Sequence, residues 1–269
     1  MMNISVFQHE SILRLGCFLS ILFLIYIGEK YWSRRQLRFN KHKRWATNLS
    51  MALLGSVFVR LLLPISATGI AYLSHQYGVG LFNFLHLNQA VSVILGIALL
   101  DVAIYAQHVI FHAVPWLWKF HRVHHADPDF DVSTGIRFHP IEILLSMLIK
   151  FAVIVLLGIP AIAVLIFEIL LNATAMFNHS NIRLPCTVDK WVRWFIITPD
   201  MHRVHHSTDY SEMNRNFGFN LSCWDRLFGT YIDQPKLGHE RMEIGLSHQQ
   251  PEQTISLTHM LLMPFNKKK

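Results

Sequence analysis

The sequence predicts an all-α fold, a polytopic bundle of membrane helices that carries a histidine-rich di-metal domain on its cytoplasmic side. Three observations predict this fold. Hydrophobic residues make up 52% of the 269 residues and charged residues only 15%, whereas a soluble domain has roughly 25% charged residues. The apolar residues are concentrated in four long runs. The 17 histidines are clustered rather than spread along the chain.

The apolar runs are long enough to cross a bilayer, which requires roughly 20 residues in a helix. They cover residues 12–27, 49–73, 90–111 and 141–177. Pro64 interrupts the second run, and the fourth is too long for one crossing. Gly158 and Pro160 lie at its middle, where glycine supports a turn and proline ends a helix. We therefore expect a hairpin of two helices, 141–157 and 161–177.

Basic residues predict the orientation, because cytoplasmic loops are enriched in Lys and Arg. Residues 29–48 carry seven Lys and Arg, whereas residues 74–89 carry none. The first loop is therefore expected to be cytoplasmic, and with the hairpin counted as two crossings the segments after His112 and His179 lie on that side too. No small-residue cleavage site follows the first run, so we expect a retained helix and no cleaved signal peptide.

Four charged residues fall inside the runs, where an unpaired charge is costly. Arg60 and Asp101 lie at a similar depth, about 17 Å from the cytoplasmic end at ~1.5 Å per residue. Lys150 and Glu168 are equally far from Ile159 on the two arms of the hairpin. We expect two ion pairs, Arg60–Asp101 and Lys150–Glu168. The alternatives are that the basic side chains reach toward the membrane surface or that each group lines a wet cavity.

The histidines form three boxes. His108 and His112 are four residues apart and therefore share one helical face. The pentapeptide HRVHH then occurs twice, at 121–125 and 202–206. Adjacent residues of a helix point about 100° apart, so we expect neighbouring histidines to serve two different metal centres. The candidate ligands, including one histidine at each edge of the hairpin, are His108, His112, His121, His124, His125, His139, His179, His202, His205 and His206.

A single HxxxH or a lone histidine is usually structural, but two identical HRVHH boxes together with an HxxxH favour a metal site. Asp101 and Tyr105 continue the helical stripe of His108 and His112 and could orient a ligand histidine by a hydrogen bond. Imidazole suits Fe, Zn, Cu and Ni, so the ligand type leaves the metal open. A zinc hydrolase is disfavoured because HExxH is absent. Two centres with open positions for O₂ could attack an unactivated C–H bond of a lipid.

The alternative function is a membrane metal- or haem-binding protein without oxygenase activity. Paired histidines within the spans would suit haem, but here they lie at the membrane edge. Nucleic acid is not expected as a partner, because anionic lipid explains the basic loop. The three cysteines are widely spaced and the sequence has no CxxC motif, so we expect the cysteines to be reduced. Residues 115–118 and 191–197 are rich in Trp and are expected to lie among the lipid headgroups.

The ordered boxes, followed by NFGFNLSCWDRLFGTY at residues 216–231, resemble the fatty acid hydroxylase superfamily, often labelled sterol desaturase. The resemblance covers roughly residues 95–232. It implies a non-haem di-iron enzyme that uses O₂ and external electrons to hydroxylate or desaturate a sterol, fatty acyl chain, ether lipid or carotenoid. It carries over nine of the candidate histidines as ligands, while His139 matches the HPxE element of sterol-acting branches. Ala175 stands where the sphingolipid acyl hydroxylases have a histidine, which favours the sterol-desaturase-like branch.

The resemblance also implies a separate electron donor, of cytochrome b5, ferredoxin or reductase type, because no HPGG haem-binding module is present. Zinc could substitute for the two irons in purified protein. We expect residues 1–94 to form N-terminal membrane helices and the basic loop, 95–232 the catalytic domain with its hairpin, and 233–269 a tail without a recognisable motif. The bacterial inner membrane and the endoplasmic reticulum both fit. In WDRLFGTY we expect Trp224, Leu227 and Phe228 to pack the domain and Asp225 to pair with Arg226.

Overall fold

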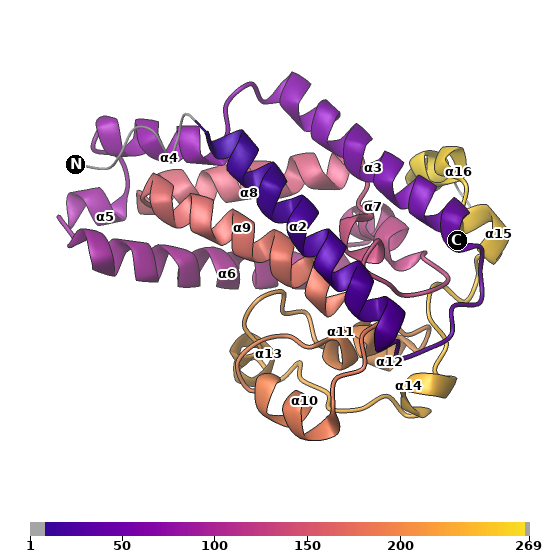
Figure 1. Ribbon diagram of the computed structural model, residues 1–269. Coiled ribbons are helices and arrows are strands. Elements are labelled where there is room, and N and C mark those ends of the chain that lie inside the picture. The colour runs from indigo at the N-terminus through magenta and orange to yellow at the C-terminus, as the bar shows by residue number, and fades with distance from the viewer. Residues whose placement is uncertain (1–8, 267–269) are drawn as a thin grey trace.

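The computed structural model describes residues 9–266 and consists of helices and loops, with three isolated β-bridges (Figure 1). The long helices are α2 (Glu10–Tyr31), α3 (Lys41–Leu62), α6 (Gln89–Ala113), α8 (Pro140–Leu157) and α9 (Ala161–Asn178). Among the described residues, five helical segments are long and apolar enough to cross a membrane: α2, the stretch from α3 to Phe84, α6, α8 and α9. This confirms the predicted all-α membrane bundle.

Shorter helices fill the two ends of the bundle. Those next to the membrane helices are α4 (Ala67–Gln76), α5 (Leu81–Phe84), α7 (Pro115–His125) and η1 (Thr134–Ile136). Those after α9 are α10 (Cys186–Val192), α11 (Pro199–His205), α12 (Tyr210–Met213), α13 (Cys223–Leu227), α14 (Gly238–Arg241), α15 (Pro251–Thr254), α16 (Leu257–Leu262) and η2 (Met263–Phe265). Figure 1 shows that α4 and α5 lie at one end, whereas α7 and the helices after α9 gather toward the other.

The predicted hairpin is confirmed, with α8 ending at Leu157 and α9 beginning at Ala161. Gly158 ends α8 with a positive φ of 69°, a left-handed conformation that glycine adopts without a side-chain clash. Pro160 is the N-cap of α9. The break at Pro64 is confirmed too, because α3 ends at Leu62 and α4 begins only at Ala67. The two arms of the hairpin therefore start and finish at the same end of the bundle.

The predicted Lys150–Glu168 ion pair is confirmed, with Nζ 2.6 Å from Oε1. Arg14 of α2 adds a second cation, 2.7 Å from the other carboxylate oxygen of Glu168. Arg14 also contacts Glu10 at 3.0 Å, and Glu10 accepts a hydrogen bond from Thr68. A charged cluster thus joins α2, α4, α8 and α9 within the apolar part of the bundle, where each charge has an opposite partner.

The predicted Arg60–Asp101 pair is wrong. Asp101 instead accepts hydrogen bonds from Asn220 Nδ2 (2.8 Å), the Leu221 backbone (3.2 Å) and Trp224 Nε1 (2.8 Å). Arg60 is exposed, and within residues 9–266 no ion pair joins it to Asp101. Similar depth in the membrane was the basis of the prediction, but depth does not determine the direction in which a side chain leaves its helix.

The expected pairing within WDRLFGTY is also wrong. Asp225 accepts hydrogen bonds from the backbone of Phe217 and Gly218, at 2.8 and 2.9 Å. The Arg226 guanidinium lies between two aromatic rings, those of Trp194 and Tyr231, at 4.0 and 3.9 Å from their centroids. Asp225 therefore shapes the loop that precedes it, and Arg226 takes part in cation–π contacts.

Leu227 and Phe228 are not core residues, because their exposed fractions are 70% and 56%, respectively. Trp191, Trp194 and Phe195 are exposed as well, and their location among lipid headgroups stays a prediction. The three cysteines are free, as expected. The division into three parts stays a prediction.

Candidate metal centre

Nine of the ten candidate histidines come together in two adjacent groups, and eight of them are buried, with His112 half-buried. The first group, which we call centre 1, contains His108, His112, His121, His125 and His205. The second, centre 2, contains His124, His179, His202 and His206. Within each group the ligand nitrogens lie within 4.8 Å of one another. Segments separated by almost a hundred residues therefore supply side chains to the same small volume.

Helical periodicity separates the neighbouring histidines of each HRVHH box. In α7, His121 and His125 are one turn apart and face centre 1, whereas His124 faces centre 2. In the second box, His202 and His206 face centre 2, whereas His205 faces centre 1. Because adjacent residues of a helix point about 100° apart, one box supplies both centres.

Hydrogen bonds orient the rings of centre 1 from behind. His121 Nδ1 lies 2.6 Å from Glu142 Oε1 at the start of α8. His108 Nδ1 lies 2.7 Å from the Phe217 carbonyl, and His205 Nδ1 lies 2.8 Å from the Arg215 carbonyl. Such partners fix the tautomer and direction of a metal-binding imidazole. They leave the Nε2 atoms directed into the centre.

Centre 2 is oriented by backbone carbonyls. His124 Nδ1 lies 3.1 Å from the Arg137 carbonyl, and His179 Nδ1 lies 2.7 Å from the Ala175 carbonyl. Gly135 packs directly against that second carbonyl, since a Cβ at Gly135 would lie 2.6 Å from the oxygen of Ala175. Only a residue without a side chain allows this close approach.

The facing nitrogens fit a bound cation. A neutral imidazole has one N–H and one lone pair, so a ring that donates from Nδ1 presents a lone pair at Nε2. The Nε2 atoms of His124 and His179 are 3.0 Å apart, as are those of His108 and His121. Two lone pairs at this distance repel each other unless a cation binds both. Metal–imidazole bonds of about 2.1 Å at a right angle place two nitrogens about 3 Å apart.

Unsatisfied ring nitrogens support the same interpretation. Nε2 of His112, Nε2 of His205 and both ring nitrogens of His125 are buried without a hydrogen-bond partner. Buried polar groups are normally hydrogen-bonded, because leaving one unpaired costs free energy. The residues of both centres therefore fit bound metal.

Some of the histidines lie outside the membrane helices, and burial keeps these in the neutral form that binds metals. It lowers the pKa of His121 to about 3 and is the main reason that the pKa of His179 is also about 3. Burial likewise lowers the pKa of His124 and His206 well below the usual value, and the neighbouring histidines lower it further. A neutral imidazole offers its lone pair to a metal without first losing a proton.

Comparison with known proteins agrees with this site. The profile of the fatty acid hydroxylase family matches residues 93–230, about half of the chain. All nine clustered histidines lie within this range. The chain belongs to the fatty acid hydroxylase family. The resemblance inferred from the histidine boxes is thereby confirmed, and the metal-dependence of the family agrees with the two histidine groups.

Relatives within the fatty acid hydroxylase family act on lipids, according to their names. The chain is 31% identical over 147 residues to ornithine lipid hydroxylase OlsE of Rhizobium tropici and 25% identical over 153 residues to alkylglycerol monooxygenase of Homo sapiens. It is 28% identical over 150 residues to cholesterol 25-hydroxylase of Rattus norvegicus. The matches cover 54–55% of this chain but only 44%, 31% and 48% of the relatives. No solved structure matches the chain.

The tenth candidate, His139, is not brought into either centre. Its Nδ1 accepts a hydrogen bond from the Ile141 backbone at 3.2 Å, which caps α8. Its Nε2 lies 3.3 Å from the Leu261 carbonyl. Both ring nitrogens are thus used elsewhere. The role of His139 as a ligand stays a prediction that this geometry does not support, and the HPIE stretch reaches centre 1 through Glu142.

Asp101 and Tyr105 do not contact a histidine nitrogen. Asp101 holds the segment around Asn220, and the Tyr105 hydroxyl lies 2.8 Å from Thr230 Oγ1. Both residues act on the loop of residues 215–231, whose Phe217 carbonyl orients His108. Their influence on the metal centre therefore passes through this loop.

The residues missed by the sequence interpretation are Glu142 and the backbone carbonyls that orient the rings. Glu142 carried a signal, because a carboxylate near the start of an apolar span is costly unless it is paired. The carbonyls of Ala175, Arg137, Arg215 and Phe217 carried none, because every residue type has the same backbone acceptor.

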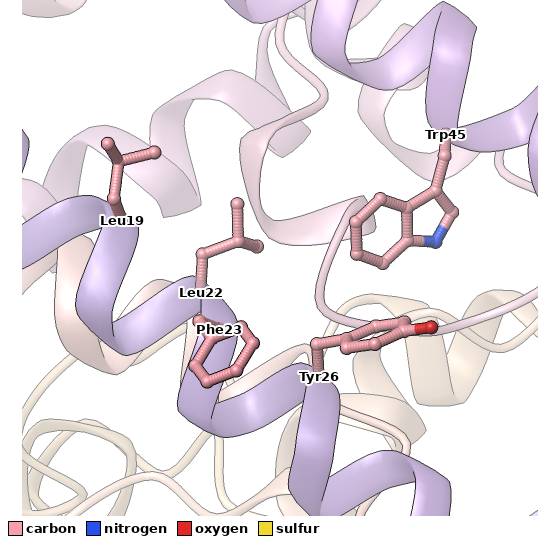
Figure 2. Close-up of a pocket in the computed structure, with 5 residues that line it drawn as sticks. All are labelled: Leu19, Leu22, Phe23, Tyr26 and Trp45. Atoms are coloured by element: carbon pink, nitrogen blue, oxygen red, sulfur yellow. The ribbon is translucent and has the colours of Figure 1, made fainter.

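The hollow drawn in Figure 2 is separate from the histidines. It measures about 370 Å³ and lies between α2 and α3, lined by Leu19, Leu22, Phe23, Tyr26 and Trp45. All five side chains are apolar or aromatic and none belongs to either centre. The hollow is therefore distinct from the two histidine centres.

Proposed function

We propose that this chain is a membrane-bound non-haem di-iron oxygenase that hydroxylates or desaturates a lipid. The observation that carries the proposal is the pair of adjacent, all-imidazole groups at the end of a bundle of apolar helices. Imidazole ligands suit iron, and paired centres beside a membrane give lipid chains direct access. The fatty acid hydroxylase profile over residues 93–230 supports the same class of enzyme.

The two irons, when bound, supply the reduction of O₂ and the oxidation of a C–H bond. In a hydroxylation, one oxygen atom enters the lipid and the other leaves as water, with two electrons and two protons from outside. Glu142 holds His121 in place, and the carbonyls of Phe217 and Arg215 do the same for His108 and His205. Zinc can take the place of iron in purified protein, because imidazole binds both.

A lipid is the proposed substrate, and hydroxylation is the proposed reaction ahead of desaturation. Support comes from the names of the relatives, a lipid hydroxylase, an alkylglycerol monooxygenase and a cholesterol hydroxylase. The electrons come from a separate donor of cytochrome b5, ferredoxin or reductase type. We further propose that Glu142, Asp101 and Tyr105 are positioning residues rather than metal ligands.

The histidine end of the bundle is proposed to face the cytoplasm, in a bacterial inner membrane or the endoplasmic reticulum. Support comes from the basic segment of residues 29–48, which joins α2 to α3 and packs against the same end of the bundle as the histidines. Arg44 contacts Asp127, two residues after His125, and Arg34 contacts Asp200, two residues before His202. The enrichment of cytoplasmic loops in Lys and Arg then assigns the side.

Lipid mass spectrometry of cells with and without the gene tests the proposal. Cells supplied with iron and grown under ¹⁸O₂ are expected to contain a lipid that has gained one labelled oxygen atom. The His121→Ala variant is the control and should give no such product. Unchanged lipids in cells that contain iron-loaded protein would contradict the proposal and favour a metal-binding protein without oxygenase activity. A Soret band in the purified protein would favour haem binding.

A further inference from the structure

Aromatic rings surround the histidines, and one of them differs from the others. Phe217 contacts His108 and His205 of centre 1, with centroids 5.4 Å apart in each case. Phe130 contacts only centre 2, at His179 and His206.

Among the aromatic residues at positions 9–266, Phe219 is the one whose ring contacts a histidine of each centre. Its ring centroid lies 5.0 Å from that of His108 and 5.9 Å from that of His202.

Phe219 also faces the membrane part of the bundle. Its half-buried side chain packs against the apolar core formed by α4, α6, α8 and α9, which includes Ile104 and Phe167. The ring therefore lies between the paired centres and the apolar interior of the bundle. An apolar chain that approaches both centres from this side would contact Phe219.

Hydrogen bonds hold the backbone at Phe219, whereas packing alone holds its ring. The Asn178 amide donates to the Phe219 carbonyl at 3.0 Å, from the end of α9. The next residue, Asn220, donates to Asp101 of α6 at 2.8 Å and contacts Thr174 of α9. These bonds involve the backbone of Phe219 and the neighbouring Asn220, so replacing the Phe219 ring leaves them in place.

We propose that Phe219 is a specificity-determining residue that closes the membrane-facing side of the paired centres and selects which carbon of the lipid chain reaches them. This inference rests on the proposed function. A bulky ring at this position limits how far an apolar chain advances between His108 and His202. A smaller side chain allows a deeper approach, so the oxygen atom enters at a different carbon.

The position of the new oxygen in the product is the direct test. Phe219→Ala is expected to shift the main product by at least one carbon or to give a mixture, whereas Phe219→Tyr keeps the wild-type position. The matched control is Phe138→Leu, because Phe138 is half-buried too but stacks on His124 alone, at 4.4 Å. An unchanged oxygen position in iron-loaded Phe219→Ala overturns the proposal, because a purely structural role changes only yield.

A second measurement does not depend on turnover. The purified wild-type protein is irradiated in vesicles of a phospholipid that carries a diazirine in one acyl chain. Labelling of the tryptic peptide 216–226 is expected, with increased labelling in Phe219→Ala. Label confined to the outer helices α2 and α3 overturns the proposal. Labelled 216–226 without any oxygenated lipid would contradict the proposed function but support the approach of acyl chains to Phe219.

Discussion

Two buried polar regions lie side by side at the histidine end of the bundle, and they differ in one respect. The first is an arginine–aspartate network. Arg44 contacts Asp127 at 2.6 and 3.0 Å and Asp131 at 2.8 Å, while Arg137 donates to Asn48 at 2.8 Å. Every buried side-chain nitrogen and oxygen of these five residues has a partner.

The second region, the nine histidines, lacks such completeness. Nitrogens of His112, His125, His202, His205 and His206 have no hydrogen-bond partner within the described chain. The comparison teaches that a polar network built for stability satisfies itself, whereas a network built for binding leaves acceptors for its ligand.

Removing a single ligand from either centre is expected to abolish turnover. His125→Ala deletes a ring of centre 1 and His206→Ala a ring of centre 2. Each variant should form no oxygenated lipid in the cellular assay, because the reaction needs both centres. Each should still fold with the melting temperature of the metal-free wild type. A variant that retains more than about a tenth of the product would show that one centre is enough.

Breaking the self-satisfied network is expected to destabilise the protein whether or not metal is bound. Arg44→Met leaves Asp127 and Asp131 buried without their cation, a change that typically costs about 3–5 kcal/mol. The melting temperature in detergent should fall in metal-loaded and chelator-treated samples alike. The neighbouring Lys43→Met is the control, because Lys43 is exposed. A loss seen only in the metal-loaded sample would contradict the distinction between the two regions.

The two regions should also respond to different ranges of pH in the metal-free protein. Burial lowers the pKa of His121 to about 3, whereas an unfolded histidine titrates at roughly 6.5. The unfolded chain therefore binds more protons, and stability falls as the pH drops from about 6.5 toward 3. Burial opposes ionisation of Asp127, but Arg44 and Arg137 lower its pKa to about 2. The contribution of Asp127 to the free energy of unfolding therefore persists until the pH falls below roughly 3.9, the pKa of an unfolded aspartate.

Melting temperatures of chelator-treated protein at about pH 7.5 and pH 5 check this prediction. The wild type should melt at a lower temperature at the more acidic pH, and Arg44→Met should show the same difference between the two pH values. If the difference disappears in Arg44→Met, the arginine network and not the histidines determines the pH dependence.

Glu142→Gln is expected to weaken centre 1 without destroying it. The carboxylate lies 2.6 Å from His121 Nδ1, and loss of such a partner typically costs 10–100-fold in metal affinity or activity. Iron titration of the metal-free variant measures the change. His139→Asn is the matched control from the same HPIE stretch and should leave iron affinity unchanged. A weaker site in His139→Asn would restore that histidine as a ligand.

Much of this architecture could be predicted because it depends on patterns among residues that are close together in the sequence. The lengths of the apolar runs predicted the membrane helices, and Gly158 with Pro160 predicted the hairpin. The 100° step between adjacent residues predicted that His124 and His125 face different centres. These features need only local geometry, which the order of residues determines.

The failures came from long-range contacts. The loop of residues 215–231 folds against α6, so Asp101 binds Asn220 and Trp224 and not Arg60. The C-terminal tail showed no motif, yet the Leu261 carbonyl in it accounts for His139 Nε2. Neither contact leaves a periodic pattern in the sequence, because the partners are more than a hundred residues apart.

Anomalous diffraction at the iron absorption edge, with the metal content of the same sample, tests the central claim most directly. The wild-type protein is predicted to hold two iron ions per chain. One should lie among the Nε2 atoms of His108 and His121, and the other among those of His124 and His179. A single ion, or two ions bound away from these nitrogens, would contradict the account.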